Sequence, residues 1–245
     1  MARYRAIIEY DGTDFEGFQR QARGRTVQGE LEKALQQLGW AGRSVLGAGR
    51  TDSGVHAAGQ VIAFELEWRH AVEQLRNALN ANLPPDVAVK EVAACAPDFH
   101  PRYSARGRWY RYSMYNTPVR APLVARYAWQ LWAPHWDMAA VRAAARQLLG
   151  RHDFVAFGND PDGGHNTVRT VTRAEWTCHG AWMYFDIQAE AFLHRMVRNL
   201  VGALKAVGMG EMAAEAFATL LASGERRKCP PPAPPQGLCL MEVIY

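Results

Sequence analysis

The order of apolar and polar residues over the first hundred positions predicts a regular alternation of strands and helices. Two segments, beginning at Thr26 and at Val72, place apolar residues on one helical face, and Thr26 can cap the first of these helices. Four short apolar stretches predict strands, at residues 6–10, 44–47, 60–66 and 87–94. The order β-α-β-β-α-β is that of the split ferredoxin-like arrangement, an antiparallel sheet backed by two helices.

The second half repeats this theme less regularly. Residues 106–115 predict a long strand, and Asp137 can cap a helix that extends to Gly150. Two further strands are predicted at residues 167–177 and 182–191. The clearest amphipathic helix of the chain follows these strands.

That helix covers residues 193–207, and the proline-rich stretch 230–235 then leads as a stiff connector into a final strand at 238–245. The pattern predicts an α+β protein of two ferredoxin-like halves with antiparallel sheets, residues 1–104 and 105–245. Because ligands favour the junction between such halves, we expect a central active-site cleft there.

Composition narrows the class of protein only slightly. The chain has 245 residues, 49% of them hydrophobic, which is enough to bury an ordinary core. Its net charge is +4, and 24 of its 28 cationic residues are arginine, whose planar donor group suits phosphates and base edges. A GC-rich genome also encodes alanine-rich and arginine-rich chains, so composition alone does not establish that this protein binds nucleic acid.

The cysteines and the amino terminus indicate an ordinary reducing compartment. The four cysteines are far apart and form no C-x-x-C pair, which argues against a zinc site and against a disulfide framework. The first residues are charged where a signal peptide would be apolar, and no apolar run approaches the roughly 20 residues of a membrane span. We therefore expect a cytoplasmic protein with no metal and no membrane segment.

Candidate chemistry concentrates in the glycine-rich loop at residues 49–56, GRTDSGVH. It places the carboxylate of Asp52 between Arg50 and His56. An aspartate in such a loop is usually a turn former, and the loop lacks the glycines of a dinucleotide fingerprint and the Gly-Lys-Ser/Thr of a P-loop. Residues 52–54 also match half of an aspartic-protease dyad, for which a homodimer could supply the second carboxylate.

The segment 48–57, AGRTDSGVHA, resembles the signature of the TruA family of tRNA pseudouridine synthases. Further blocks resemble the same family in the same order, and they cover the chain from end to end: residues 9–12, 18–21, 26–28, 80–84, 99–105, 110–112, 152–154, 168–170, 192–199 and 237–240. Three residues depart from the family pattern: Ser53 stands in place of alanine, Arg195 in place of a second histidine, and Cys239 in place of an aromatic residue.

The resemblance implies an isomerase that needs no cofactor. In the family the aspartate of the R-T-D block is the nucleophile, so this role falls to Asp52, and the arginine of the M-V-R-N block, Arg198, keeps the carboxylate ionised and aimed. Tyr110 matches the tyrosine that stacks on the target base and is a candidate proton shuttle. Without the resemblance, Arg198 would be read as part of a solvated helix face and Tyr110 as a core aromatic.

Contacts to RNA are implied at further positions. Arg50 would fill the space left when the target uridine leaves its stack, and Leu238 would line the uracil pocket. Alternation along one strand places cationic and aromatic residues on one face: Arg106, Arg108, Tyr110 and Tyr112. The remaining expected contacts, Gln19, Arg20, Arg25 and His56, belong to the resembling blocks or lie close to them, and His56 is expected chiefly to order its loop.

The family's usual targets are the uridines at positions 38, 39 and 40 of the tRNA anticodon stem-loop, and by resemblance the protein is a homodimer in which one tRNA touches both subunits. The rival hypothesis is an RNA-binding module without catalysis. The combination of Asp52, Tyr110 and Arg198 argues against that rival, because binding alone has no use for a carboxylate near phosphates. Whether Asp52 attacks C1′, adds to C6 or removes the C2′ proton is left open by the sequence.

Overall fold

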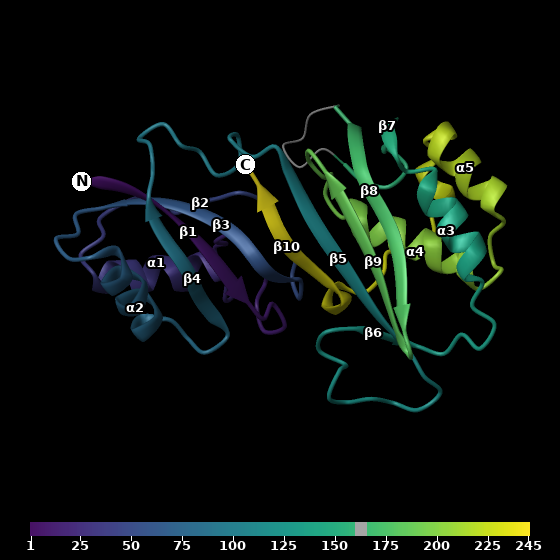
Figure 1. Ribbon diagram of the computed structural model, residues 1–245, viewed down its shortest axis with the longest axis horizontal. Coiled ribbons are helices and arrows are strands. Elements are labelled where there is room, and N and C mark those ends of the chain that lie inside the picture. Colours follow the sequence, from purple (N-terminus) through teal and green to yellow (C-terminus); the bar gives the residue numbers. More distant parts are fainter. Residues whose placement is uncertain (160–165) are drawn as a thin grey trace. The chain divides into compact units, whose positions relative to one another are not determined.

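The computed structural model describes residues 1–159 and 166–245, which form two compact units (Figure 1). The first unit comprises Met1–Arg106 together with Cys239–Tyr245, and the second comprises Gly107–Leu238. Within the described residues, no helix is both long enough and apolar enough to cross a lipid bilayer.

The first unit has the predicted β-α-β-β-α-β order. Its elements along the chain are β1 (Ala2–Tyr10), α1 (Val27–Gln37), β2 (Leu46–Gly47), β3 (His56–Leu66), α2 (Val72–Asn82) and β4 (Val87–Ala94). β1 lies between β4 and β3, and β2 pairs with β3, all antiparallel. The ferredoxin-like prediction for this part of the chain is therefore confirmed.

Alternation and helical periodicity build the core of this unit. Every second residue of β1 from Tyr4 to Tyr10 is buried, because side chains of a strand point alternately to its two faces. α1 buries Val27, Leu31 and Leu35 along one face, and the Thr26 hydroxyl accepts a hydrogen bond from the Gly29 amide at 3.3 Å. Each of these fully buried aliphatic side chains stabilises the unit by about 2 kcal/mol.

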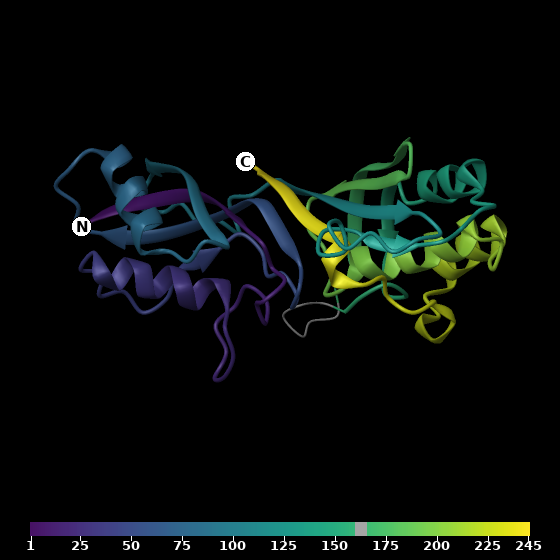
Figure 2. The same ribbon diagram turned by 90° about the horizontal axis from the view of Figure 1, so that it is seen from below.

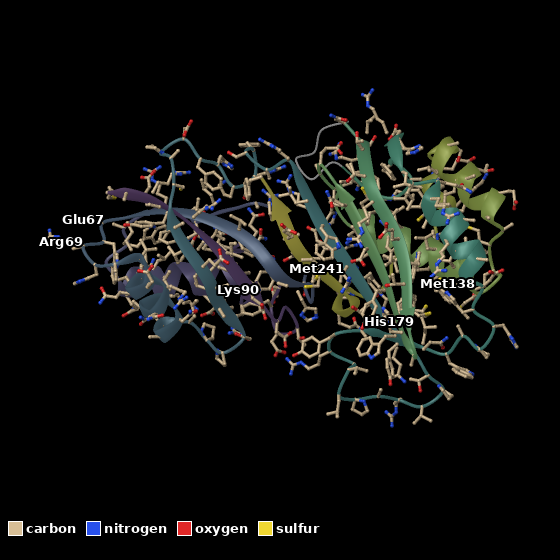
Figure 3. The ribbon with its side chains drawn as sticks, in the orientation of Figure 1. Glu67, Arg69, Lys90, Met138, His179 and Met241 are labelled. Carbon is tan, nitrogen blue, oxygen red and sulfur yellow. The ribbon has the colours of Figure 1, made fainter. Side chains whose placement is uncertain are left out.

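The last strand, β10 (Leu238–Ile244), departs from the expectation of purely antiparallel sheets. It pairs with β3 in parallel, Cys239 opposite His56, so it extends the sheet of the first unit. A Cβ on Gly59 of β3 would lie 2.3 Å from the carbonyl oxygen of Met241, so the two strands approach closely at this point. Figure 3 labels Met241 on β10. Parallel partners need a long connection between them, and here the connection comprises α2, β4 and the chain of the second unit.

The second unit is built on the strand order β5-β9-β8-β7. Its strands are β5 (Gly107–Asn116), β6 (Trp129–Leu131), β7 (Gly150–Asp153), β8 (Val168–His179) and β9 (Trp182–Ala189). The pairs within β5-β9-β8-β7 are antiparallel, and the short β6 pairs with β5 in parallel. The α+β class is thus confirmed, with two parallel strand pairs that local pattern did not predict.

The described residues of this unit form the α-helices α3 (Met138–Arg146), α4 (Met196–Gly208) and α5 (Ala214–Ser223), and the short 3₁₀ helices η1 (Arg226–Lys228) and η2 (Pro235–Gly237). Figure 2 shows α4 running along one face of the strands. Asp137 caps α3 as predicted, but the helix ends at Arg146 rather than at Gly150. Gly150, which has a φ of 95°, is the first residue of β7. α4 begins at Met196 because Arg195 takes a left-handed conformation, with φ 61°.

Candidate active site

The loop that carries Asp52 is bonded along its backbone to the segment 15–18. The Phe18 amide donates to the Thr51 carbonyl at 3.1 Å, and the Gly54 amide donates to the Phe15 carbonyl at 3.3 Å. The Ser53 hydroxyl donates to the same Phe15 carbonyl at 3.1 Å. Asp52 itself is half-buried between these anchored neighbours, so the loop fixes the backbone from which its carboxylate extends.

Glycines allow the close approach of these two segments. A Cβ on Gly12 would lie 2.0 Å from the carbonyl oxygen of Val55, and one on Gly17 would lie 2.6 Å from that of Thr51. Gly17 and Gly54 also have positive φ angles of 93° and 76°, which favour glycine. Gly12 and Gly17, which precede the Asp52 loop by roughly 40 residues in the sequence, therefore help to determine the shape of that loop.

His56 supports the loop from its carboxyl end. The residue is 7% exposed, and its Nδ1 accepts a hydrogen bond from the Gly12 amide at 3.0 Å. Asp11 Oδ1 lies 3.2 Å from the same Nδ1 atom. His56 thus joins the start of β3 to the turn after β1.

The other end of the loop is held by Gln60 and Tyr10. The Gln60 amide nitrogen donates to the Gly49 carbonyl at 2.9 Å, and the Tyr10 and Thr51 hydroxyls lie 2.8 Å apart in the interior. Arg50, between Gly49 and Thr51, is exposed. The structure therefore presents Arg50 at the surface while fixing the residues on both sides of it.

The three residues expected to contact RNA near the amino terminus have different surroundings. Gln19 is exposed, whereas Arg20 forms an ion pair with Glu32 at 2.5 Å. Arg25 donates two hydrogen bonds to the carboxylate of Asp86, at 2.6 and 2.8 Å, and its guanidinium lies 4.2 Å from the centre of the Phe15 ring. The carboxylate of Asp86 raises the pKa of Arg25 above its usual value, against a smaller opposing effect of burial.

In the second unit, β5 carries a row of buried side chains on one face. Arg108 and Tyr110 are each 8% exposed, and Tyr112 is fully buried. The Tyr110 ring meets the ring of Phe192 edge to face, with centroids 5.0 Å apart, and Arg108 donates to the Glu190 carbonyl at 2.7 Å. The expected shared face is therefore observed for these residues, while Arg106 lies in the first unit.

Arg198 lies in the first turn of α4 and is half-buried rather than part of an exposed face. Its Nε donates to the Ala233 carbonyl at 2.8 Å, and the Ala233 amide donates to the Arg198 carbonyl at 2.9 Å. The Tyr112 hydroxyl donates to the next carbonyl, that of Pro234, at 2.8 Å. Leu238, 6% exposed, follows this proline-rich segment directly.

Tyr112 is protonated in this setting. Burial raises the pKa of its hydroxyl far above the usual value, and the positive charge of Arg198 opposes that shift. The protonated hydroxyl can donate its hydrogen bond to the Pro234 carbonyl. The sequence pattern placed Tyr112 on the face of Tyr110 but did not reveal this bond, whose partner lies 122 positions away.

The residues expected to be catalytic lie in different units: Asp52 is in the first, and Tyr110 and Arg198 are in the second. Leu238, expected to line the uracil pocket, is also in the second unit. The pairing of Asp52 with Arg198 stays a prediction. Across residues 1–159 and 166–245, no group of three or more histidine, cysteine, aspartate or glutamate side chains is arranged to hold a metal ion.

Comparison with known proteins identifies relatives over the whole chain. The family described as tRNA pseudouridine synthase matches residues 6–104 and 144–245. The tRNA pseudouridine synthase A of Syntrophotalea carbinolica is 44% identical over 245 residues, which are 100% of this chain and 97% of that protein. The enzyme of the same name from Solidesulfovibrio magneticus is 46% identical over 260 residues, covering 100% and 92%.

Proposed function

The chain belongs to the tRNA pseudouridine synthase family, and on that premise we propose that it isomerises uridines 38, 39 and 40 of the tRNA anticodon stem-loop, with Asp52 as the nucleophile. The reaction breaks the N1–C1′ glycosidic bond, turns the uracil and joins C5 to C1′. No atom is gained or lost and no electron is transferred, so side chains of the protein are sufficient to catalyse it.

The anchoring of the Asp52 loop is the observation that supports this proposal most directly. Four hydrogen bonds tie residues 51, 53, 54 and 56 to the segments at residues 12 and 15–18. A nucleophile must be held within a fraction of an ångström of its reacting atom, and a loop bonded on both sides of Asp52 meets that requirement.

Tyr110 and Arg198 receive roles that suit their surroundings. The buried ring of Tyr110, braced by Phe192, offers a stacking surface for uracil, and its hydroxyl can move a proton. Arg198, held at Nε by Ala233, carries the positive charge that keeps a carboxylate ionised. In this proposal, residues 1–104 supply the nucleophile and residues 105–245 supply Tyr110, Arg198 and Leu238.

The RNA contacts follow the same proposal. Arg50, exposed on the Asp52 loop, takes the place of the extruded uridine, and Leu238 packs against the uracil ring. The remaining residues that we propose for RNA binding are Gln19, Arg20, Arg25, His56, Arg106 and Arg108. Arg108 bonds to a neutral backbone carbonyl, so it would act on the phosphates through its positive charge. Arg20 and Arg25 are paired with Glu32 and Asp86, and they would have to exchange these carboxylates for phosphate.

We also propose a cytoplasmic homodimer in which one tRNA contacts both subunits. The subunit has a mass of 27.4 kDa, and light scattering after size exclusion should give twice that value at micromolar concentration. A mass of one subunit at every concentration tested, in an enzyme active on tRNA, would reject the dimer without affecting the catalytic proposal.

Incubation of the purified chain with unmodified tRNA, followed by mapping of pseudouridine along the RNA, tests the function. We expect product at positions 38 to 40 and no requirement for an added cofactor. An RNA-binding module without catalysis would bind the tRNA and leave every uridine unchanged. Family membership removes the aspartic-protease alternative, because that chemistry belongs to an unrelated class of enzyme.

A further inference from the structure

The segment at residues 230–237, PPPAPPQG, forms a strap between α4 and β5. Ala233 is the only residue of the run 230–235 that is not proline, so it has the only backbone N–H of that run. That N–H donates to the Arg198 carbonyl, and the carbonyl of the same Ala233 accepts from Arg198 Nε. Ala233 and Arg198 are therefore joined by a reciprocal pair of hydrogen bonds.

Glycines bring the strap into close contact with both elements. Gly202 lies one helical turn after Arg198, and a Cβ there would lie 2.1 Å from the Pro231 carbonyl oxygen. A Cβ on Gly237 would lie 2.6 Å from Cζ of Tyr112. Ala233 is fully buried between these two contacts. The strap is thus held against α4 at one end and against the Tyr112 ring at the other.

We infer that Tyr112 is a positioning residue for Arg198 and acts through the strap. Its hydroxyl bonds the Pro234 carbonyl, and the neighbouring carbonyl, that of Ala233, bonds Arg198 Nε. Proline rings on both sides of Ala233 restrict the backbone, so fixing one carbonyl restrains the next. The Nε bond uses one of the five N–H donors of the guanidinium and sets the plane in which the other four lie.

This inference rests on the proposed role of Arg198 toward Asp52. If the guanidinium turns out of this plane, its N–H groups and its charge are displaced from the position that favours contact with a carboxylate. Small displacements of catalytic groups reduce the rate by large factors. The ring of Tyr112 accounts for its packing in the core. The hydroxyl is therefore the part of the side chain that the positioning role requires.

Tyr112→Phe keeps the ring and removes the hydroxyl. We expect kcat to fall about tenfold with little change in the KM for tRNA, because the interaction lost matters in the transition state and not in tRNA binding. Tyr245→Phe is the matched control: the Tyr245 hydroxyl donates to a proline carbonyl, that of Pro101, also at 2.8 Å, but in the first unit. We expect its kcat to equal that of the wild type.

A double-mutant cycle separates positioning from a merely structural effect. Lysine at position 198 has no planar guanidinium for the strap to orient, so Tyr112→Phe should change the rate of Arg198→Lys by less than about twofold. A tenfold loss in both backgrounds would overturn the inference, because the hydroxyl would then act independently of Arg198.

Failure of the inference and failure of the proposed function give different results. If Arg198→Lys is impaired but Tyr112→Phe has the wild-type rate, only the positioning role is overturned. If Arg198→Lys itself turns over at the wild-type rate, the role proposed for Arg198 is overturned, and the positioning role with it.

Discussion

The hydroxyl oxygens of Tyr10 and Thr51 lie 2.8 Å apart in the buried interior of the first unit. Tyr10 is the last residue of β1, and its ring also packs against Phe18, with centroids 6.5 Å apart. Thr51 immediately precedes Asp52. The end of a central strand of the first unit is thereby connected to the residue beside the proposed nucleophile.

Thr51→Val tests this connection, because valine keeps the shape of threonine but lacks its hydroxyl. We expect kcat to fall by about tenfold or more and the free energy of unfolding to fall by roughly 1–3 kcal/mol, since Tyr10 loses a buried hydrogen-bond partner. Thr51→Ser keeps the hydroxyl and should keep most of the rate. Steady-state kinetics and denaturant unfolding measure both effects, and a valine variant with the wild-type kcat would contradict the prediction.

Tyr110→Phe separates stacking from proton transfer. The ring and its edge-to-face contact with Phe192 remain, so tRNA affinity should not change. The single-turnover rate should fall by about 10² or more if the hydroxyl transfers a proton. Tyr115→Phe, on the same strand but on the opposite face, is the control and should react normally. An unchanged rate for Tyr110→Phe would leave stacking as the function of this side chain.

Arg25→Ala should lower stability, because Arg25 forms two hydrogen bonds with Asp86 and covers the Phe15 ring. Because the Arg25–Asp86 pair is partly exposed, we expect the free energy of unfolding to fall by about 1 kcal/mol. This corresponds to a fall in Tm of roughly 2–4 °C for a chain of this size. Arg23→Ala, an exposed arginine two residues away, should leave Tm unchanged. Calorimetry that gave equal Tm values for the two variants would contradict this structural role for Arg25.

The sequence was sufficient for elements whose signal is local. α1 was predictable because its apolar residues recur with helical spacing after a threonine cap. The strands β1 to β4 were predictable in order but not in extent, since β1 begins at Ala2 rather than at residue 6, and β3 at His56 rather than at residue 60. β6 and β7, of three and four residues, are too short to show a period. The parallel pairing of β10 with β3 was not predictable, because the identity of a strand's partner is not written in the strand itself.

The candidate site likewise combines features that have a local sequence signal with features that depend on residues far apart in the chain. The resemblance and the glycines indicated the Asp52 loop, but the role of Gly12 depends on Val55, far along the chain. The ion pair of Arg25 with Asp86 spans 61 positions and has no local signal. One long-range contact did leave a trace in the sequence: a single alanine within a proline run marks the place where a backbone N–H is required, and that N–H bonds Arg198.

The central claim is that Asp52 performs the chemistry. Asparagine at this position would keep the size and shape of the side chain without its charge, so the Asp52→Asn variant should fold, and its affinity for tRNA should stay within about tenfold of the wild type. Asp98→Asn, the same substitution at an exposed aspartate of the first unit, is the matched control and should remain active.

The most direct measurement is the single-turnover formation of pseudouridine in unmodified tRNA by excess Asp52→Asn enzyme, with binding of the same tRNA measured in parallel. We predict bound tRNA and no pseudouridine above the level without enzyme. Pseudouridine formed at a rate near that of the wild type would contradict the assignment of Asp52 as the nucleophile.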